Sequence, residues 1–146
     1  MDNIKKLREL TGSSIVLCKQ ALEKSGGDFS KALEILGKSV EAIADKKSGR
    51  VAGAGIIDAY VHGNNKIGVL LELRTETDFV ARNDAFKTLA HELSLHIAAM
   101  NPRDITMFLS QPYVKDPSVT TEELIKQSSG NFGEKIEVAR FSRFEL

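Results

Sequence analysis

The sequence has little of the chemistry that marks extracellular or membrane proteins. Among 146 residues there is no tryptophan and one cysteine, Cys18, which excludes an internal disulfide, fits a reducing compartment and is expected to be a small core residue. No run of about 18 apolar residues is present, which argues against a transmembrane helix. Residues Met1–Lys6 have no apolar segment behind them and do not resemble a signal peptide. We therefore expect a cytoplasmic protein, or an organellar matrix protein if a transit peptide has been removed.

An excess of charge of one sign is also missing, since 20 basic residues face 20 acidic ones. Nothing therefore indicates a surface for nucleic acid or for an anionic membrane. No Gly-x-x-x-x-Gly-Lys loop is present to bind phosphate. His91 and His96 are five residues apart, roughly 140° around a helix, which does not make a metal site. We expect no metal, no cofactor and no catalytic centre, so the protein is not interpreted as an enzyme.

Residues 1–40 are predicted to form three short helices separated by glycines. The first ends at Thr11-Gly12, Ser13 or Ser14 caps the second, and Asp28 caps the third. We assign residues 1–40 to a helical domain and residues 41–55 to a helical linker.

The run Ile15-Val16-Leu17 cannot face one small core, because successive helix residues are about 100° apart. Two interpretations stay open. The run contains a single exposed aliphatic residue, which needs no explanation, or it forms a docking patch for a partner protein.

Residues 56–146 alternate between strand and helix patterns and are predicted to form an α+β core domain. Three antiparallel strands are expected, with helices on one side of the sheet. The expected segments are strand Ile56–His62, turn Gly63–Asn65, strand Lys66–Arg74, helix Asp84–Met100, an irregular region over 104–119, a short helix from the capping box Thr120–Glu123 to about Gln127, a loop over 128–131 and a bulged strand over Lys135–Leu146.

The stretch Thr75–Asn83 joins the best strand pattern to the best helix pattern, and Asn83 is a suitable N-cap. Phe79 and Val80 beside Asp78 are unusual in a loop that only connects two elements, and functional residues concentrate in such loops. The alternative is that Glu72, Glu76 and Asp78 only stabilise the helix dipole and stay solvated. His96, beside the apolar stripe, is either a packed or exposed histidine or a partner contact.

Four ordered blocks resemble the elongation factor Ts family, whose members are nucleotide-exchange factors for elongation factor Tu in translation. The resemblance covers nearly the whole chain. The blocks are Ile4–Gly12 continuing through Cys18–Leu22 to Gly27-Asp28, then Ile67–Glu72 with Glu76–Asn83, then His96–Pro102, and finally Gln111–Val114 with Arg140–Leu146.

The resemblance implies a ubiquitin-associated-like three-helix bundle that docks on the nucleotide-binding domain of elongation factor Tu. By matching position, Arg8, Ile15 and Val16 make that contact. The motif Thr77-Asp78-Phe79-Val80 is the exchange wedge, in which Asp78 and Phe79 enter near the partner's magnesium site. His96 contacts the partner's other domains. GDP and Mg²⁺ belong to the partner, so no cofactor, nucleic acid or membrane contact is implied.

The sequence departs from the family at three places. Only Arg103–Ser110 lies where members normally carry a long helical segment, and Leu17 replaces a common Asp. Ser142 stands where short members have a cysteine, which excludes a disulfide-linked dimer and leaves a non-covalent homodimer through the terminal strands open.

Two other functions are compatible with parts of this pattern. One is a module that binds elongation factor Tu without exchange activity, as a chaperone or a replication-complex subunit. The other is a ubiquitin-binding protein, which would account for the bundle but not for residues 56–146.

Overall fold

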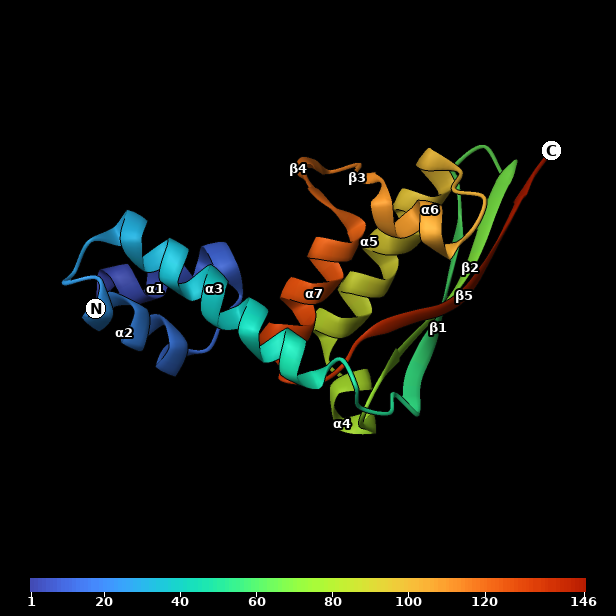
Figure 1. Ribbon diagram of the computed structural model, residues 1–146. Helices are drawn as coiled ribbons and strands as arrows, with labels where there is room; N and C mark the ends of the chain where they lie inside the picture. The colour runs from blue at the N-terminus through green and yellow to red at the C-terminus, as the bar shows by residue number, and fades with distance from the viewer.

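The computed structural model describes all 146 residues and has two lobes joined by the helix α3 (Figure 1). The smaller lobe contains the N-terminal helices, and the larger lobe contains the sheets and the remaining helices. The elements are α1 (Asp2–Thr11), α2 (Ile15–Lys24), α3 (Phe29–Lys47), β1 (Ala54–Val61), β2 (Ile67–Thr75), α4 (Asp78–Ala81), α5 (Asp84–Met100), α6 (Ile105–Ser110), β3 (Pro112–Tyr113), β4 (Asp116–Thr120), α7 (Thr121–Phe132) and β5 (Glu137–Glu145).

The three-helix bundle is confirmed, together with the caps that start its second and third helices and the glycine that ends its first helix. Gly12 ends α1 in the left-handed conformation with φ 70°. Ser14 accepts a hydrogen bond from the Leu17 amide at the start of α2, and Asp28 accepts one from the Lys31 amide at the start of α3. The bundle core consists of six buried residues, Leu7, Cys18, Ala21, Ala32, Leu36 and Val40.

Helix α3 runs without interruption across residue 40, where the helical domain was expected to end. Val40 is buried in the bundle core, and Ala44, one turn further on, is also buried. The helix has 19 residues, and only residues 48–53 between its end and β1 lack regular structure. The division into 1–40, 41–55 and 56–146 stays a prediction, but α3 contributes to both lobes.

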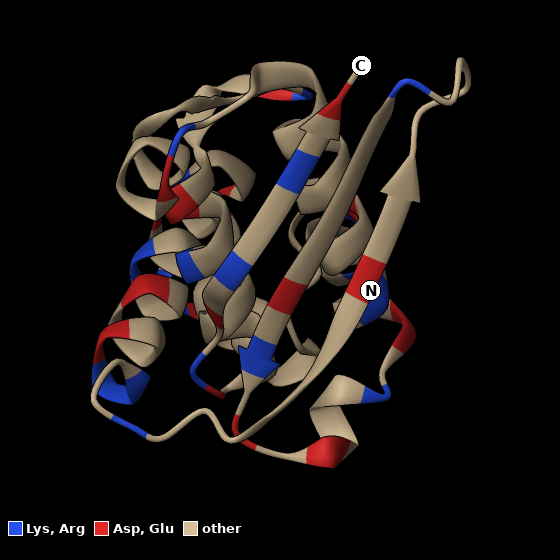
Figure 2. Cartoon of the chain, turned by 90° about the vertical axis from the view of Figure 1, so that its right-hand side faces the viewer, with Lys and Arg blue, Asp and Glu red and all other residues tan.

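The larger lobe is the predicted α+β arrangement. Its main sheet has the antiparallel order β1-β2-β5, with a register shift after Glu72 in the β2–β5 pair. Helix α5 packs on one face, while the other face is open to solvent, and Figure 2 looks onto that open face with the helices behind it. The buried residues of this face and of α5 include Val69, Leu71, Leu73, Phe86, Ala90, Leu93 and Ile97.

The prediction of an irregular region over 104–119 was wrong. Asp104 accepts a hydrogen bond from the Met107 amide and so starts the short helix α6, and β3 pairs with β4 further on. Met100, in the last turn of α5, is 39% exposed.

Helix α7 begins at the predicted capping box but continues to Phe132, so the predicted loop over 128–131 was also wrong. Glycine is a poor helix former, and its presence at position 130 inside this helix is explained by a contact with α3. A Cβ atom at Gly130 would lie 2.1 Å from the Val40 carbonyl oxygen of α3, so only glycine allows the two helices to approach this closely.

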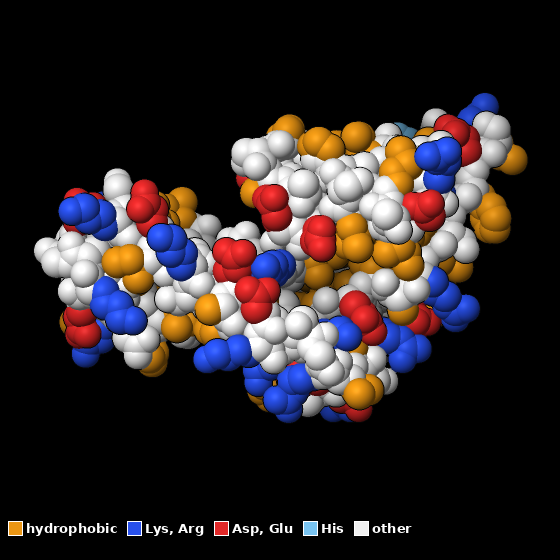
Figure 3. All heavy atoms as spheres, in the orientation of Figure 1, with side chains coloured by type: hydrophobic (Ala, Val, Ile, Leu, Met, Phe, Trp, Pro, Cys, Tyr) orange, Lys and Arg blue, Asp and Glu red, His pale blue; other side chains and the backbone are white.

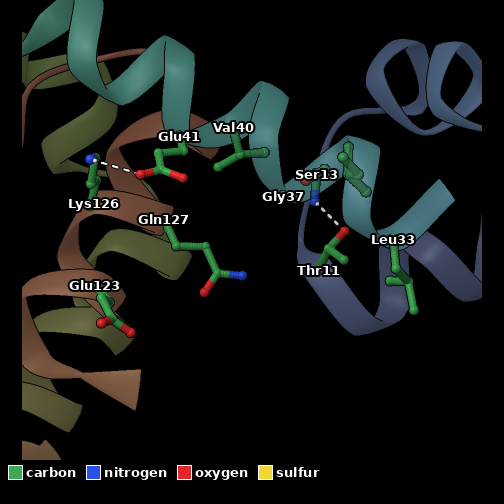
Figure 4. A pocket seen from close by; sticks show the side chains of 10 residues that line it. Thr11, Ser13, Leu33, Gly37, Val40, Glu41, Glu123, Lys126 and Gln127 are labelled. Atoms are coloured by element: carbon green, nitrogen blue, oxygen red, sulfur yellow. Dashed lines mark hydrogen bonds and ion pairs between the residues drawn. The ribbon is translucent and has the colours of Figure 1, made fainter. Parts of the chain in front are cut away.

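Polar contacts between α3, α7 and the turn after α1 hold the two lobes together. Lys126 lies 3.2 Å from Glu41 and 2.8 Å from Asp45, and Figure 4 shows Lys126 and Glu41 turned toward each other. The side-chain nitrogen of Asn131 donates to the Thr11 carbonyl at 2.9 Å, and its side-chain oxygen accepts from the Ser13 hydroxyl at 2.8 Å. A cleft of about 470 Å³ lies between these elements, at the waist seen in Figure 3.

None of the helices combines the length and the apolar composition that crossing a membrane requires.

Candidate partner-binding sites

The α4 segment, which we define as Thr75–Asn83, is held by a helix cap at each end. The Thr77 hydroxyl accepts a hydrogen bond from the Val80 amide at 3.3 Å and starts the single turn α4. Asn83 accepts from the Ala85 amide at 2.8 Å and starts α5, as predicted. Two short-range caps therefore fix where the chain turns between β2 and α5.

Within this segment the four predicted wedge residues separate into two pairs. Asp78 and Phe79 point into solvent, and the Phe79 side chain is 86% exposed. Val80 is 6% exposed and belongs to the core of the larger lobe, while Thr77 caps the helix. The structure thus presents an aromatic ring and a carboxylate together on an anchored turn, with Thr77 and Val80 as their support.

A carboxylate distant in sequence binds the first half of the α4 segment. One oxygen of Glu134 accepts hydrogen bonds from the Thr75 hydroxyl at 3.0 Å, the Glu76 amide at 3.2 Å and the Thr77 amide at 3.0 Å. Its other oxygen accepts from the Thr77 hydroxyl at 2.7 Å. Sequence reasoning missed Glu134, because it lies 57 residues from Thr77 and belongs to no recognisable motif.

Glu76 forms a reciprocal link to the same region. One oxygen of its side chain accepts from the Lys135 amide at 2.9 Å, and the other pairs with Arg50 at 3.1 Å. The α4 segment and the connection between α7 and β5 therefore bind each other through side-chain and backbone groups.

The predicted docking residues Arg8, Ile15 and Val16, which we call the docking patch, all lie on the surface of the bundle. Ile15 is 54% exposed and Val16 is 62% exposed at the start of α2. Arg8 and Ile15 line the same shallow hollow of about 510 Å³. Leu17, by contrast, is half-buried against the bundle core, so two of the three consecutive aliphatic residues are exposed.

His96 is fully buried, although it was predicted to contact a partner. Its Nε2 atom lies 2.9 Å from Gln111 Oε1, and its Nδ1 atom accepts a hydrogen bond from the Val114 amide at 3.1 Å. This network assigns the proton to Nε2. The ring also stacks on Tyr113. A direct contact would require residues 111–114 to move away, and the contact stays a prediction.

Burial lowers the pKa of His96, and its hydrogen bond to Gln111 opposes that shift. A protonated ring could not accept from the Val114 amide, so the observed packing requires the neutral form. The role that the geometry gives to His96 is to fix the segment before β4 against α5.

Glu92 attaches the same segment to α5 from outside. Its carboxylate accepts from the Tyr113 hydroxyl at 2.6 Å and from Lys115 at 2.8 Å. Burial alone would raise the pKa of Glu92, but the hydrogen bonds from Lys115 and Tyr113 outweigh it, and the net pKa is lowered. Burial and the hydrogen bond to Glu92 raise the pKa of Tyr113.

Titratable residues elsewhere do not gather into a recognisable metal centre, since no group of three or more His, Cys, Asp or Glu side chains is placed to hold an ion. His91 lies 3.5 Å from Asp58. Cys18 is buried in the bundle core, and burial raises the pKa of its thiol. Cys18 therefore contributes packing.

The open face of the sheet carries an exposed apolar patch. Val61, Leu70 and Phe144 are 61%, 52% and 77% exposed, and the strand register brings them into adjacent rows. Ser142 pairs with Leu70 in the same patch and is exposed. A charged row formed by Glu72 and Arg140, 3.2 Å apart, borders it.

Comparison with known sequences gives one consistent result. The sequence model of the family described as elongation factor TS matches residues 76–146. An elongation factor Ts of Thermotoga neapolitana is 40% identical over 189 aligned positions, which cover 100% of this chain and 96% of the relative. One of Acetivibrio thermocellus is 35% identical over 97% of this chain and 87% of its own length. One of Nostoc sp. is 43% identical over 98% of this chain and 45% of its own length.

The relatives differ in length within the aligned region. The Thermotoga neapolitana alignment has 189 positions against 146 residues here, so at least 43 of its positions have no counterpart in this chain. The Nostoc alignment has 143 positions for 98% of the chain and leaves no room for such a gap. At least one relative therefore aligns with nearly the whole chain without an insertion of that size.

Proposed function

We propose that this chain, which belongs to the elongation factor Ts family, is a cytoplasmic guanine-nucleotide exchange factor that binds elongation factor Tu and promotes release of GDP. The proposal assigns two contacts to one molecule. The docking patch binds the partner's nucleotide-binding domain, and Asp78 and Phe79 enter beside the Mg²⁺ and phosphates of the bound nucleotide.

The observation that carries the proposal is the exposure of Phe79 on a turn whose next two residues are buried. Phe79 is 86% exposed, while Val80 and Ala81 are 6% and 3% exposed. An aromatic side chain held in water by a rigid support gains free energy when a partner covers it, about 1.5–3 kcal/mol for full burial. Because the support is already ordered, little conformational entropy is lost on insertion.

Exchange of this kind needs no chemical step. If the chain binds nucleotide-free elongation factor Tu more tightly than the GDP complex, it lowers the affinity for GDP by the same factor. Asp78 would act on the hydrogen bonds and charges around the magnesium ion, which is often the largest local charge in a phosphate site. Phe79 would supply the apolar contact that is available only in the opened state.

The docking patch has a different task in this mechanism. Ile15 and Val16 add apolar area, and Arg8 adds a charge, at a distance from the nucleotide. Contacts of this type raise the occupancy of the complex and the effective concentration of the wedge. They are not expected to set how fast GDP leaves once the complex has formed.

A stopped-flow titration of GDP release can separate these two tasks. A fluorescent GDP analogue bound to elongation factor Tu is mixed with increasing concentrations of the chain. The double variant Asp78→Ala/Phe79→Ala should lose most of the acceleration at saturation. The variant Ile15→Ser/Val16→Ser should raise the concentration needed for half-maximal acceleration about 10-fold or more, because two exposed aliphatic contacts are lost, with a maximal rate close to that of the wild type.

Each outcome has a defined meaning, provided that circular dichroism shows both variants to be folded. Full acceleration by Asp78→Ala/Phe79→Ala would contradict the wedge. If the unchanged chain binds elongation factor Tu but leaves GDP release at its spontaneous rate, the chain is a binding module without exchange activity.

The open sheet face supports a second contact, a non-covalent homodimer. Two flat faces can stack about 10 Å apart, and the patch Val61, Leu70 and Phe144 would then be covered by its own copy. Sedimentation equilibrium would detect the dimer, and Leu70→Ser should shift it toward the monomer. A chain that stays monomeric at high micromolar concentration would contradict this contact.

A further inference from the structure

We infer that Glu134 is the positioning residue of the exchange site, a carboxylate that holds the α4 segment so that Asp78 and Phe79 stand at a fixed place. This inference rests on the proposed function of those two residues. Both carboxylate oxygens of Glu134 bind groups of the α4 segment. Its side chain is half-buried and turned toward Thr75, Glu76 and Thr77, and no other side chain binds this stretch at as many points.

The carboxylate oxygens of Glu134 accept all four of its side-chain hydrogen bonds. Each of the four groups bound to it is a donor, two backbone amides and two hydroxyls. A carboxylate has enough lone pairs to accept all four, and bonds to a charged acceptor are stronger than neutral ones. An amide side chain of the same size offers one accepting oxygen and one donating nitrogen, so it cannot reproduce the set.

Thr77 transmits the position of Glu134 to the wedge. Its hydroxyl donates to Glu134 at 2.7 Å and accepts from the Val80 amide at 3.3 Å. The same oxygen atom therefore connects the anchor to the first turn of α4. Because Thr77 is the residue directly before Asp78, a displacement of Thr77 changes the direction in which Asp78 and Phe79 project.

The anchor itself is held rigidly at the junction of α7 and β5. Gly133 ends α7 in the left-handed conformation with φ 70°, which directs the following residue away from the helix. The Ser129 hydroxyl donates to the Glu134 carbonyl at 2.6 Å, and the Lys135 amide donates to Glu76 at 2.9 Å. Glu134 thus stands on fixed backbone on both sides, so it can determine the position of the segment it binds.

The first test uses the free chain and needs no partner. Amide hydrogen exchange at Glu76 and Thr77 is measured by NMR for the wild type, Glu134→Gln and Glu134→Ala. Exchange at both amides should become about 10-fold faster or more in Glu134→Gln, because their acceptor is weakened and one hydroxyl bond is lost. Glu137→Gln is the matched control, since Glu137 lies three residues further on and makes one exposed ion pair, with Lys135 at 3.4 Å.

The second test is GDP release from elongation factor Tu, measured as a full titration. Glu134→Gln should lower the maximal release rate several-fold and leave the half-maximal concentration within about twofold of the wild type, since the docking patch is untouched. A general loss of folding would instead lower the denaturation midpoint and reduce the fraction of active protein. Glu134→Asp, which keeps the charge on a shorter side chain, should recover more activity than Glu134→Ala.

Unchanged protection of Glu76 and Thr77 in both Glu134→Gln and Glu134→Ala would overturn the inference. A maximal GDP-release rate in Glu134→Gln equal to that of the wild type would also overturn the inference. If the wild-type chain itself does not accelerate GDP release, the proposed function fails. Hydrogen exchange on the free chain then decides separately whether Glu134 anchors the segment.

Discussion

The two lobes present their proposed contact residues by different means. In the bundle, Ile15 and Val16 stand in the first turn of α2, and their direction follows from helix geometry and the Ser14 cap alone. In the larger lobe, Phe79 stands on a single turn that could not persist by itself, and its position depends on Glu134 from the other end of the chain. Side chains at a helix end can therefore be oriented by local geometry, whereas those on an isolated turn must be held by the tertiary structure.

The lobes also differ in the size of the core behind these residues. The bundle core has six buried residues and the core of the larger lobe has 15. A small core supplies little stability of its own. We expect the bundle to depend on its contacts with α7, and three experiments test the difference between the lobes, from the largest expected effect to the smallest.

The largest effect is expected from shortening one leucine in each core. Leu36→Ala and Leu93→Ala each remove a side chain that is 1% or 0% exposed, at a cost of about 2–5 kcal/mol. In the bundle, the loss from Leu36→Ala should exceed the free energy of local unfolding. The bundle amides should then lose protection from hydrogen exchange, while the amides of α5 keep theirs. Leu93→Ala should instead lower the global denaturation midpoint.

Hydrogen exchange read residue by residue, together with urea unfolding, checks this pair. Loss of protection in α5 to the same extent in Leu36→Ala would show that the molecule opens as one unit. The asymmetry between the lobes would then be refuted.

A smaller effect is expected at the joint between the lobes. Gly130→Ala places a methyl group against the Val40 carbonyl and should cost about 1–3 kcal/mol as an overpacked contact. Gly37→Ala is the control, because it is also helical but has nothing within 4 Å of its added Cβ. Gly37→Ala should stabilise by about 0.5–1 kcal/mol. Thermal unfolding of both variants measures the two changes in stability. Equal changes for Gly130→Ala and Gly37→Ala would contradict the close approach of α7 to α3.

The smallest effect is a pH dependence confined to the larger lobe. The folded-state pKa of His96 lies below the ordinary value of 6.5, so below about that pH the unfolded chain binds more protons than the folded chain. The free energy of unfolding should therefore fall as the pH drops below 6.5. Its slope should be at most about 1.4 kcal/mol per pH unit, and the loss should end below the folded-state pKa. Urea unfolding of the wild type and of His96→Gln between pH 7.5 and 5 measures this, and parallel curves for the two proteins would contradict it.

Local signals in the sequence predicted much of the fold. Helix α5 was placed at its observed bounds because Asn83 caps its start and the apolar residues repeat at helical spacing. Helix α6 was missed although Asp104 could have been recognised as its cap. The end of α7 was missed because Ser128, Ser129 and Gly130 favour a loop, and only the contact of Gly130 with α3 explains a helix there.

In the candidate sites, too, contacts between residues distant in the sequence could not be predicted. Asp78, Phe79, Ile15 and Val16 were identified from the sequence, and their exposure agrees with surface roles. His96 was identified too, but its burial depends on Gln111 and Val114, which meet it only in the folded chain. Glu134 could not be found, because a pairing across 57 residues leaves no periodic trace in the sequence.

The continuity of α3 has a consequence for insertions and deletions. Because one helix of 19 residues, about 28 Å long, contributes to both lobes, the spacing and the rotation between docking patch and wedge are set by residue count. One residue added between Leu36 and Ala44 would shift the bundle by about 1.5 Å and turn it by about 100° about the helix axis. Ile15 and Val16 would then face a different side from Phe79. Natural variation in this helix should therefore change side chains freely on its exposed face while keeping its length constant.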